Sequence, residues 1–149
     1  MKVNKDCLLL IAEFEGLSLR PYLCPAKKAT IGYGNTYYKD GKKVTMLDKN
    51  ITKEEALDLL KVIVDSFAKE VSKLVVSPLN QNQFNALVSF TYNIGANNLK
   101  NSTLLKLINK DPNQLAISND IIKWVNAGGQ KSKGLEKRRI KESQNYFKK

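Results

Sequence analysis

The feature that most constrains the fold of this chain is a long amphipathic pattern that begins at Thr52. Thr52 and Glu55 have the spacing of a capping box, in which each side chain accepts a hydrogen bond from the backbone of the other residue. Apolar residues then recur at steps of three and four, the period of one helix face: Ala56, Leu57, Leu60, Val64, Phe67, Ala68, Val71 and Leu74. The pattern predicts a helix of about 22 residues, which at ~1.5 Å per residue is long enough to connect two lobes.

The segment before this helix, residues 17–46, has the pattern of short strands and turns. Apolar and polar residues alternate from Leu17 to Tyr22, and Pro21 restricts this strand to the edge of a sheet. Asp40-Gly41 lies between two β-prone runs and is a hairpin signal. We therefore expect a small antiparallel sheet of about three strands.

Helices are expected on both sides of this β segment. Asn4 or Asp6 can cap a first helix, which Gly16 ends, so that Glu15 is its last residue. Four further helices are expected, from Ser77-Pro78 to Gly95, from Asn101 or Ser102 to Ile108, from Asn119 to Val125 where Gly128-Gly129 follows, and from Gly134 to Phe147. The elements predict an α+β fold: a small β lobe at about 17–46, and a larger helical lobe at about 52–149 together with the N-terminal helix.

Length and charge limit what such a fold can do. A chain of 149 residues has the usual size of one domain, so we expect a single domain, 1–149, with a ligand cleft between the lobes. Lys and Arg number 25 against 14 Asp and Glu, a formal net charge of +11. Such a surface attracts nucleic acid, acidic lipid or the anionic polymers of a bacterial envelope. The basic residues show no recognition-helix or aromatic-platform arrangement, so no nucleic-acid partner is expected.

Several common chemistries are excluded by composition. Histidine is absent, which removes the usual general base and the commonest metal ligand. Cys7 and Cys24 alone cannot build a zinc site, so we expect neither a metal nor another cofactor. Residues 1–16 do not form a good signal peptide, and no segment reaches the ~20 apolar residues of a membrane span. We therefore expect a soluble monomer that is synthesised in the cytoplasm.

Three reactive side chains lie between the first helix and the returning strand. Eight residues separate Glu15 from Cys24, and five separate Cys24 from Thr30. A carboxyl group beside Phe14 at a helix end is a candidate acid, because burial and the helix dipole would both favour its protonated form. Alone, each residue has a plainer explanation as a solvated glutamate, a small buried cysteine or a strand threonine. Only their combination is informative.

This combination resembles the catalytic motif of the phage-type lysozymes, the endolysins of glycoside hydrolase family 24. Their motif is Glu, eight residues, Asp or Cys, five residues and Thr, and Ile31-Gly32-Tyr33-Gly34 is similar to the strand that follows it. Residues 83–95 resemble the central helix of the family, 101–105 the start of its next helix, and 124–139 its C-terminal signature. The resemblance covers almost the whole chain and implies a lysozyme-like fold.

The activity that this resemblance implies is that of a muramidase, which hydrolyses the β-1,4 bond between N-acetylmuramic acid and N-acetylglucosamine in peptidoglycan and so lyses the phage host. Glu15 would be the general acid that protonates the glycosidic oxygen. Cys24 would orient or activate water, or capture the oxocarbenium-like centre, and Thr30 would hold the attacking water. Inversion at the anomeric carbon is expected from the family resemblance alone.

Six further residues are candidates for binding the glycan strand: Tyr33, Tyr92, Asn93, Gly134, Leu135 and Arg138. The tyrosines and the asparagine offer aromatic faces and an amide, which suit pyranose rings and N-acetyl groups, whereas the last three match the C-terminal signature. Arg138 or Arg139 can pair with Glu15, and Trp124 is expected in the core. Asn35 stands where some family members carry a histidine that pairs with a carboxylate, so we expect this difference to affect stability.

Two other activities stay open at this point. A lytic transglycosylase needs the acid but no attacking water, so Cys24 and Thr30 at the hydrolase spacing argue against it. A non-catalytic cationic protein that binds or disrupts the envelope would depend on charge and not on Glu15. Because no export signal is expected, release of the enzyme to the wall would need a holin or an equivalent leak, without direct contact between the two.

Overall fold

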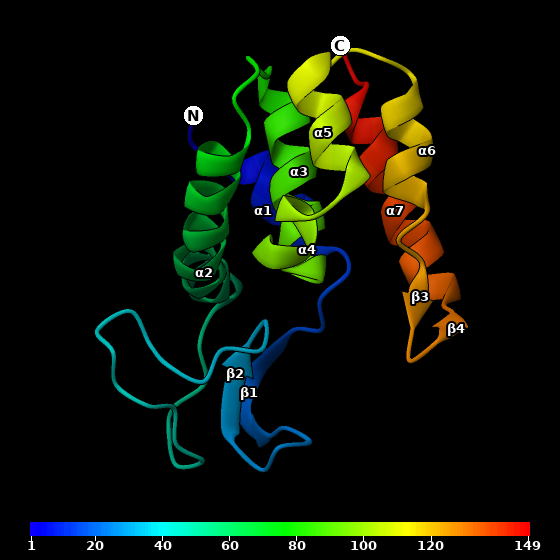
Figure 1. The fold of residues 1–149 in the computed structure, drawn as a ribbon. Helices are drawn as coiled ribbons and strands as arrows, with labels where there is room; N and C mark the ends of the chain where they lie inside the picture. Colours follow the sequence, from blue (N-terminus) through cyan, green and yellow to red (C-terminus); the bar gives the residue numbers. More distant parts are fainter. The chain divides into compact units, whose positions relative to one another are not determined.

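The computed structural model describes all residues from 1 to 149. Contacts between residues group the chain into two compact units: Leu8–Asp65 form one, and Met1–Cys7 with Ser66–Lys149 form the other. Two helices contribute residues to both units, α1 (Lys5–Ala12) and α2 (Lys53–Leu74) (Figure 1). None of the helices combines the length and the apolar character that crossing a membrane would require.

The long helix predicted from the amphipathic pattern is confirmed as α2, which has 22 residues. The Thr52 hydroxyl accepts a hydrogen bond from the Glu55 backbone N–H at 3.1 Å, and the Glu55 carboxylate accepts one from the Thr52 N–H at 3.0 Å. The apolar stripe is buried at Ala56, Leu60, Val64 and Val71. The amphipathic pattern, the N-terminal capping box and the buried face therefore agree along this helix.

The first helix is shorter than predicted. Helix α1 is capped by Asn4, whose side chain accepts a hydrogen bond from the Cys7 N–H at 3.2 Å. After Ala12 the chain continues in a tightened turn, in which the Phe14 N–H donates to the Ile11 carbonyl and the Glu15 N–H to the Ala12 carbonyl, at 3.1 and 3.2 Å. Bonds of this i to i−3 type close a helix without a left-handed glycine. The prediction that Glu15 is the last helical residue is therefore wrong.

The sheet of the Leu8–Asp65 unit has two strands, not three. Strand β1 (Ser18–Leu23) pairs antiparallel with β2 (Ala29–Gly32), and Tyr22 lies opposite Thr30. Gly34, at φ 90°, turns the chain so that Asn35 pairs back onto Ile31 and no third strand extends. The Asp40-Gly41 turn is present, with the Gly41 N–H donating to the Tyr38 carbonyl at 3.0 Å, but its flanks make only one isolated bridge, between Tyr37 and Lys43.

The other unit is a helical bundle built around α3 (Gln81–Ile94), in which every residue from 83 to 91 is buried. Helix α3 packs against α7 (Lys133–Tyr146), and the remaining elements are α4 (Ala96–Lys100), α5 (Thr103–Lys110), α6 (Ala116–Ile122), β3 (Asn126–Ala127) and β4 (Gln130–Lys131). Figure 1 shows α3, α5, α6 and α7 as neighbours in this bundle, with the β3–β4 hairpin at the end of α6.

Several predicted helix limits in this bundle need correction. Helix α3 begins after Asn80, which forms a capping box with Gln83, and not at Ser77-Pro78. Asn119 lies inside α6, because this helix already begins at Ala116. Gly128 and Gly129, at φ 59° and 81°, form the tight turn of the β3–β4 hairpin, which the sequence analysis missed. The end of α3 at Gly95 and the cap of α5 at Ser102 are as predicted.

Candidate active site

Cys24 and Thr30 are brought together by the β1–β2 hairpin. Cys24 directly follows β1, and Thr30 is the second residue of β2. The connecting turn is closed by two backbone hydrogen bonds, from the Cys24 N–H to the Lys28 carbonyl at 3.0 Å and from the Lys27 N–H to the Cys24 carbonyl at 2.8 Å. The predicted proximity of these two residues therefore follows from the strand register and the turn.

The Cys24 thiol lies in an environment that favours its ionised form. A backbone hydrogen bond from Lys28, and then a side-chain hydrogen bond with Thr30, hold the pKa of Cys24 below its ordinary value. Thr30 is buried, with 2% of its surface exposed, and its hydroxyl donates to the Lys28 carbonyl at 2.9 Å. A hydroxyl carries one hydrogen, so Thr30 can donate to that carbonyl or to the thiolate, but not to both. For Thr30 to donate to the thiolate, its hydroxyl has to rotate away from the Lys28 carbonyl.

Glu15 belongs to the same compact unit as Cys24 and Thr30. Its side chain is half-buried and lies in the turn that follows α1. Glu15 lies three residues beyond the end of α1 at Ala12, and the field of a helix dipole falls off within the last turn, so Glu15 is not at the helix end where the dipole was predicted to act on it.

Tyr33 and Asn35 are buried next to the hairpin. Tyr33 is 6% exposed and Asn35 4%, so the position of Tyr33 does not favour a direct contact with sugar. The Asn35 amide donates to the Leu59 carbonyl at 3.2 Å, whereas its Oδ1 is buried without a partner. Asn35 thus anchors the turn after β2 to α2 through a backbone carbonyl.

The other unit contains a pocket of about 450 Å³ that includes two predicted substrate contacts, Asn93 and Leu135. Its remaining lining residues are Ile94, Asn98, Lys123, Trp124 and Asn126. Trp124 was expected in the core, but it is half-buried and lines this pocket while its ring packs edge-on against Phe90 at 5.9 Å. Trp124 and Asn126 both belong to the segment 124–139, which resembles the C-terminal signature of the family. That resemblance was the signal that could have identified both residues as candidates for binding.

The other predicted substrate-binding residues of this unit differ in their exposure and in what they contact. Tyr92, near the end of α3, packs edge-on against Phe67 at 5.4 Å between the ring centroids. Gly134 is exposed in the first turn of α7. Arg138 is 4% exposed and donates to the Glu142 carboxylate at 3.3 Å and to the Ser89 carbonyl at 3.2 Å, so its position does not favour direct contact with substrate.

Glu142, which the sequence analysis did not single out, is the centre of a buried ionic cluster. It is fully buried, accepts a hydrogen bond from the Ser89 hydroxyl at 2.6 Å, and lies 2.8 Å from the Nε of Arg139. Burial, partly offset by the Glu142 charge, lowers the pKa of Arg139 to about 10. Two arginines, Arg138 and Arg139, thus contact one buried carboxylate.

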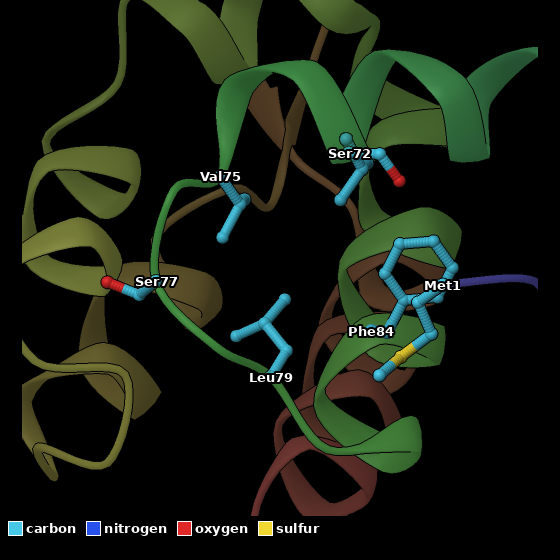
Figure 2. Close-up of a pocket in the computed structure, with 7 residues that line it drawn as sticks. Met1, Ser72, Val75, Ser77, Leu79 and Phe84 are labelled. Atoms are coloured by element: carbon cyan, nitrogen blue, oxygen red, sulfur yellow. The ribbon is translucent and has the colours of Figure 1, made fainter.

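A second pocket in the same unit, of about 170 Å³, is mainly apolar. Figure 2 shows Val75 and Leu79 pointing into it, with Phe84 and Met1 at its side. None of the predicted catalytic or substrate-binding residues lines it.

Comparison with known proteins agrees with the predicted family and fold. The family model described as phage lysozyme matches residues 12–142. The chain is 34% identical over 146 residues to the endolysin of Acyrthosiphon pisum secondary endosymbiont phage 1, covering 95% of both proteins. It is 40% identical over 144 residues to the endolysin of Bacillus phage B103, but it spans only 52% of that relative, about half its length.

A solved structure extends the similarity to the fold. The crystal structure of a P22 lysozyme mutant superposes with a TM-score of 0.89 at 31% identity, covering 99% of both chains. The predicted lysozyme-like α+β fold and the family resemblance are thereby confirmed. Since the family model covers most of the chain and a relative that is 34% identical matches 95% of it, this chain belongs to the phage lysozyme family.

Proposed function

We propose that this protein is an endolysin muramidase, which hydrolyses the β-1,4 bond between N-acetylmuramic acid and N-acetylglucosamine in bacterial peptidoglycan. Membership of the phage lysozyme family supports peptidoglycan as the substrate. The observation that carries the proposal is the juxtaposition of Cys24 and Thr30 on the β1–β2 hairpin, in the unit that also contains Glu15.

In the proposed mechanism Glu15 donates a proton to the glycosidic oxygen as the bond from that oxygen to the anomeric carbon breaks. A water molecule that donates one hydrogen bond to the Thr30 hydroxyl attacks the anomeric carbon from the opposite face. The Cys24 thiolate accepts the proton that this water loses. The new C–O bond forms as the glycosidic bond breaks, the leaving sugar departs as an alcohol with the proton from Glu15, and the configuration inverts.

The proposal is tested by replacing Glu15 with glutamine, which removes the transferable proton while keeping the size of the side chain. Lysis of chloroform-treated Gram-negative cells, followed by turbidity, should fall by at least ~100-fold, the usual contribution of general acid catalysis. Cys24→Asp should keep measurable lysis, because a carboxylate can also accept the proton. Full activity of the Glu15→Gln protein would overturn the mechanism.

The chemical ends of the released products distinguish hydrolysis from lytic transglycosylation. Mass spectrometry of released muropeptides should show reducing muramic acid ends, whereas 1,6-anhydro ends would indicate a lytic transglycosylase. The net charge of +11 favours one further activity, that of a cationic envelope-binding protein. That activity would persist in Glu15→Gln and would decline as lysines are replaced.

We also propose that Tyr92, Asn93, Gly134 and Leu135 contribute to binding of the glycan strand, and that the buried Tyr33 and Arg138 contribute indirectly, through the residues that they contact. The enzyme would act as a monomer on the wall after a holin or an equivalent leak releases it. Co-expression in a bacterial host with and without a pore-forming holin tests the release step, since only the pair should lyse the culture.

A further inference from the structure

Arg139 connects the buried ionic cluster to the pocket that Asn93 lines. The side chain of Arg139 is fully buried, and its Nη2 donates a hydrogen bond to the Asn93 Oδ1 at 2.9 Å. Its Nε lies against Glu142 at 2.8 Å as an ionic contact without the geometry of a hydrogen bond, and its Nη1 has no hydrogen-bond partner. Asn93 is therefore the hydrogen-bond acceptor of this guanidinium.

This contact determines which way the Asn93 amide points. Arginine has donors only, so the atom 2.9 Å from its Nη2 has to be the amide oxygen. The NH2 group of Asn93 is thereby held on the other side of the amide, and it makes no hydrogen bond within the protein. Asn93 is exposed and lines the pocket, so this group is available to a ligand.

Arg139 also supports the aromatic side of the same pocket. Its guanidinium carbon lies 4.9 Å from the centroid of the Phe90 ring, and Phe90 in turn packs edge-on against Trp124. Trp124 lines the pocket together with Leu135. Arg139 thus contacts the polar wall of the pocket directly, at Asn93. It reaches the aromatic wall, at Trp124, through the Phe90 ring.

The polar groups of the pocket match a secondary amide. The Asn98 NH2 group donates to the Ile94 carbonyl at 2.6 Å, which leaves the Asn98 Oδ1 as an acceptor. With the Asn93 NH2 group as a donor, the pocket offers partners for both the C=O and the N–H of an amide, next to apolar surface from Trp124 and Leu135. Acetamido groups and peptide bonds both have this pattern.

We propose that Arg139 is a positioning residue, which orients the Asn93 amide so that its NH2 group donates to an amide carbonyl of the bound glycopeptide. This inference rests on the proposed function for the nature of the ligand. It assigns to Arg139 a role in binding that is separate from its ionic contact with Glu142.

The test compares Asn93→Asp with Asn97→Asp, both in a Glu15→Gln background that prevents turnover. Aspartate at position 93 can still accept from Arg139 but has no donor for the ligand, whereas Asn97 does not line the pocket and controls for the added charge. The probes are a disaccharide–tripeptide muropeptide and tri-N-acetylglucosamine, with Kd measured by calorimetry. Loss of one hydrogen bond should raise the Kd of Asn93→Asp about tenfold, and Asn97→Asp should bind as the parent does.

A double-mutant cycle with Arg139→Lys tests positioning itself. If Arg139 acts through Asn93, Arg139→Lys weakens binding, and adding it to Asn93→Asp weakens binding little further. The side-chain NH2 resonances of Asn93 should shift on ligand addition in the parent and lose that response in Arg139→Lys. The midpoint of thermal unfolding, measured for each variant, identifies any loss that comes from unfolding.

Three results would overturn the inference: equal Kd values for the two aspartate variants, additive effects in the cycle, or no binding of either probe to the parent. Binding of the muropeptide alone would identify a peptide amide as the ligand group, and binding of both probes an acetamido group. Failure of the proposed function would appear elsewhere, as full lytic activity of Glu15→Gln.

Discussion

Cys24 is proposed as the second catalytic residue, and the β1–β2 hairpin places its thiol where the ionised form is favoured. The Lys28 N–H and the Thr30 hydroxyl stabilise the thiolate, so the pKa of Cys24 is lowered without a neighbouring cation having to act. The Thr30 hydroxyl can donate its one hydrogen to the thiolate and accept a hydrogen bond from water at its oxygen, so the two interactions are compatible. The side chain that lowers the pKa of Cys24 is also the one proposed to bind water.

The first prediction concerns the reactivity of Cys24. Its alkylation by iodoacetamide should have a pH midpoint below the ~8.5 of a free cysteine, because only the thiolate reacts. Thr30→Val should raise that midpoint, since it removes one of the two main stabilising hydrogen bonds. Mass spectrometry after timed quenching measures the rate at each pH.

An internal control is present in the chain. Cys7 is fully buried, with its thiol donating to the Asn85 carbonyl at 3.7 Å, and should stay unmodified in the folded protein. A midpoint for Cys24 at or above ~8.5 would contradict the hydrogen-bonding scheme.

In each compact unit, secondary-structure elements bring candidate residues together. The β1–β2 register places Cys24 and Thr30 together, and α3 with α7 places Asn93 beside Arg139. Helix α2 contributes to both compact units, so its stability affects each of them. The capping box between Thr52 and Glu55 stabilises the start of that helix through residues only three positions apart.

The second prediction is that Thr52→Ala lowers the free energy of unfolding by about 1 kcal/mol, the usual cost of a lost helix cap. The Glu55 N–H then loses its side-chain acceptor. Urea denaturation measures the change. Thr52→Ser retains the hydroxyl and should unfold close to the wild-type midpoint; equal midpoints for the alanine and serine variants would show that the cap is without effect.

The whole molecule is dominated by its positive charge. Exposed lysines follow one another at four-residue steps on α7, at Lys133 and Lys137, so they lie on one helix face. An anionic envelope should attract this surface at low ionic strength. The attraction should weaken as salt shortens the screening length.

The third prediction is that retention on purified cell walls falls as ionic strength rises from about 0.05 M to about 0.3 M, where screening is much stronger. Co-sedimentation of the Glu15→Gln protein measures retention without digestion of the walls. Replacing Lys133 and Lys137 by glutamine should flatten this salt dependence, and replacing both by arginine should preserve it. A salt profile that is the same in all three proteins would exclude this helix face from the interaction.

Elements with a strong local signal were predictable from the sequence. The α2 pattern and its cap, the Gly95 end of α3 and the Ser102 cap depend on residues within one or two turns, so period and side-chain chemistry determine them. The predicted limits of elements with weaker local signals were wrong. The end of α1 is closed by backbone bonds, and the two-residue strands β3 and β4 are too short to show any alternation.

The candidate site residues divide in the same way, into features that the sequence determines and features that only the structure determines. By itself, the sequence determined the spacing of Glu15, Cys24 and Thr30, the family and the positive charge, because each is a property of residue order or composition. Only the tertiary structure decided that Arg138 and Tyr33 are buried, that Trp124 lines a pocket, and that Glu142 and Arg139 form an ionic cluster reaching Asn93. Arg139 and Glu142 are only three residues apart on α7, but the Arg139–Asn93 contact joins two helices. Burial and such contacts follow from packing between helices, which no local pattern encodes.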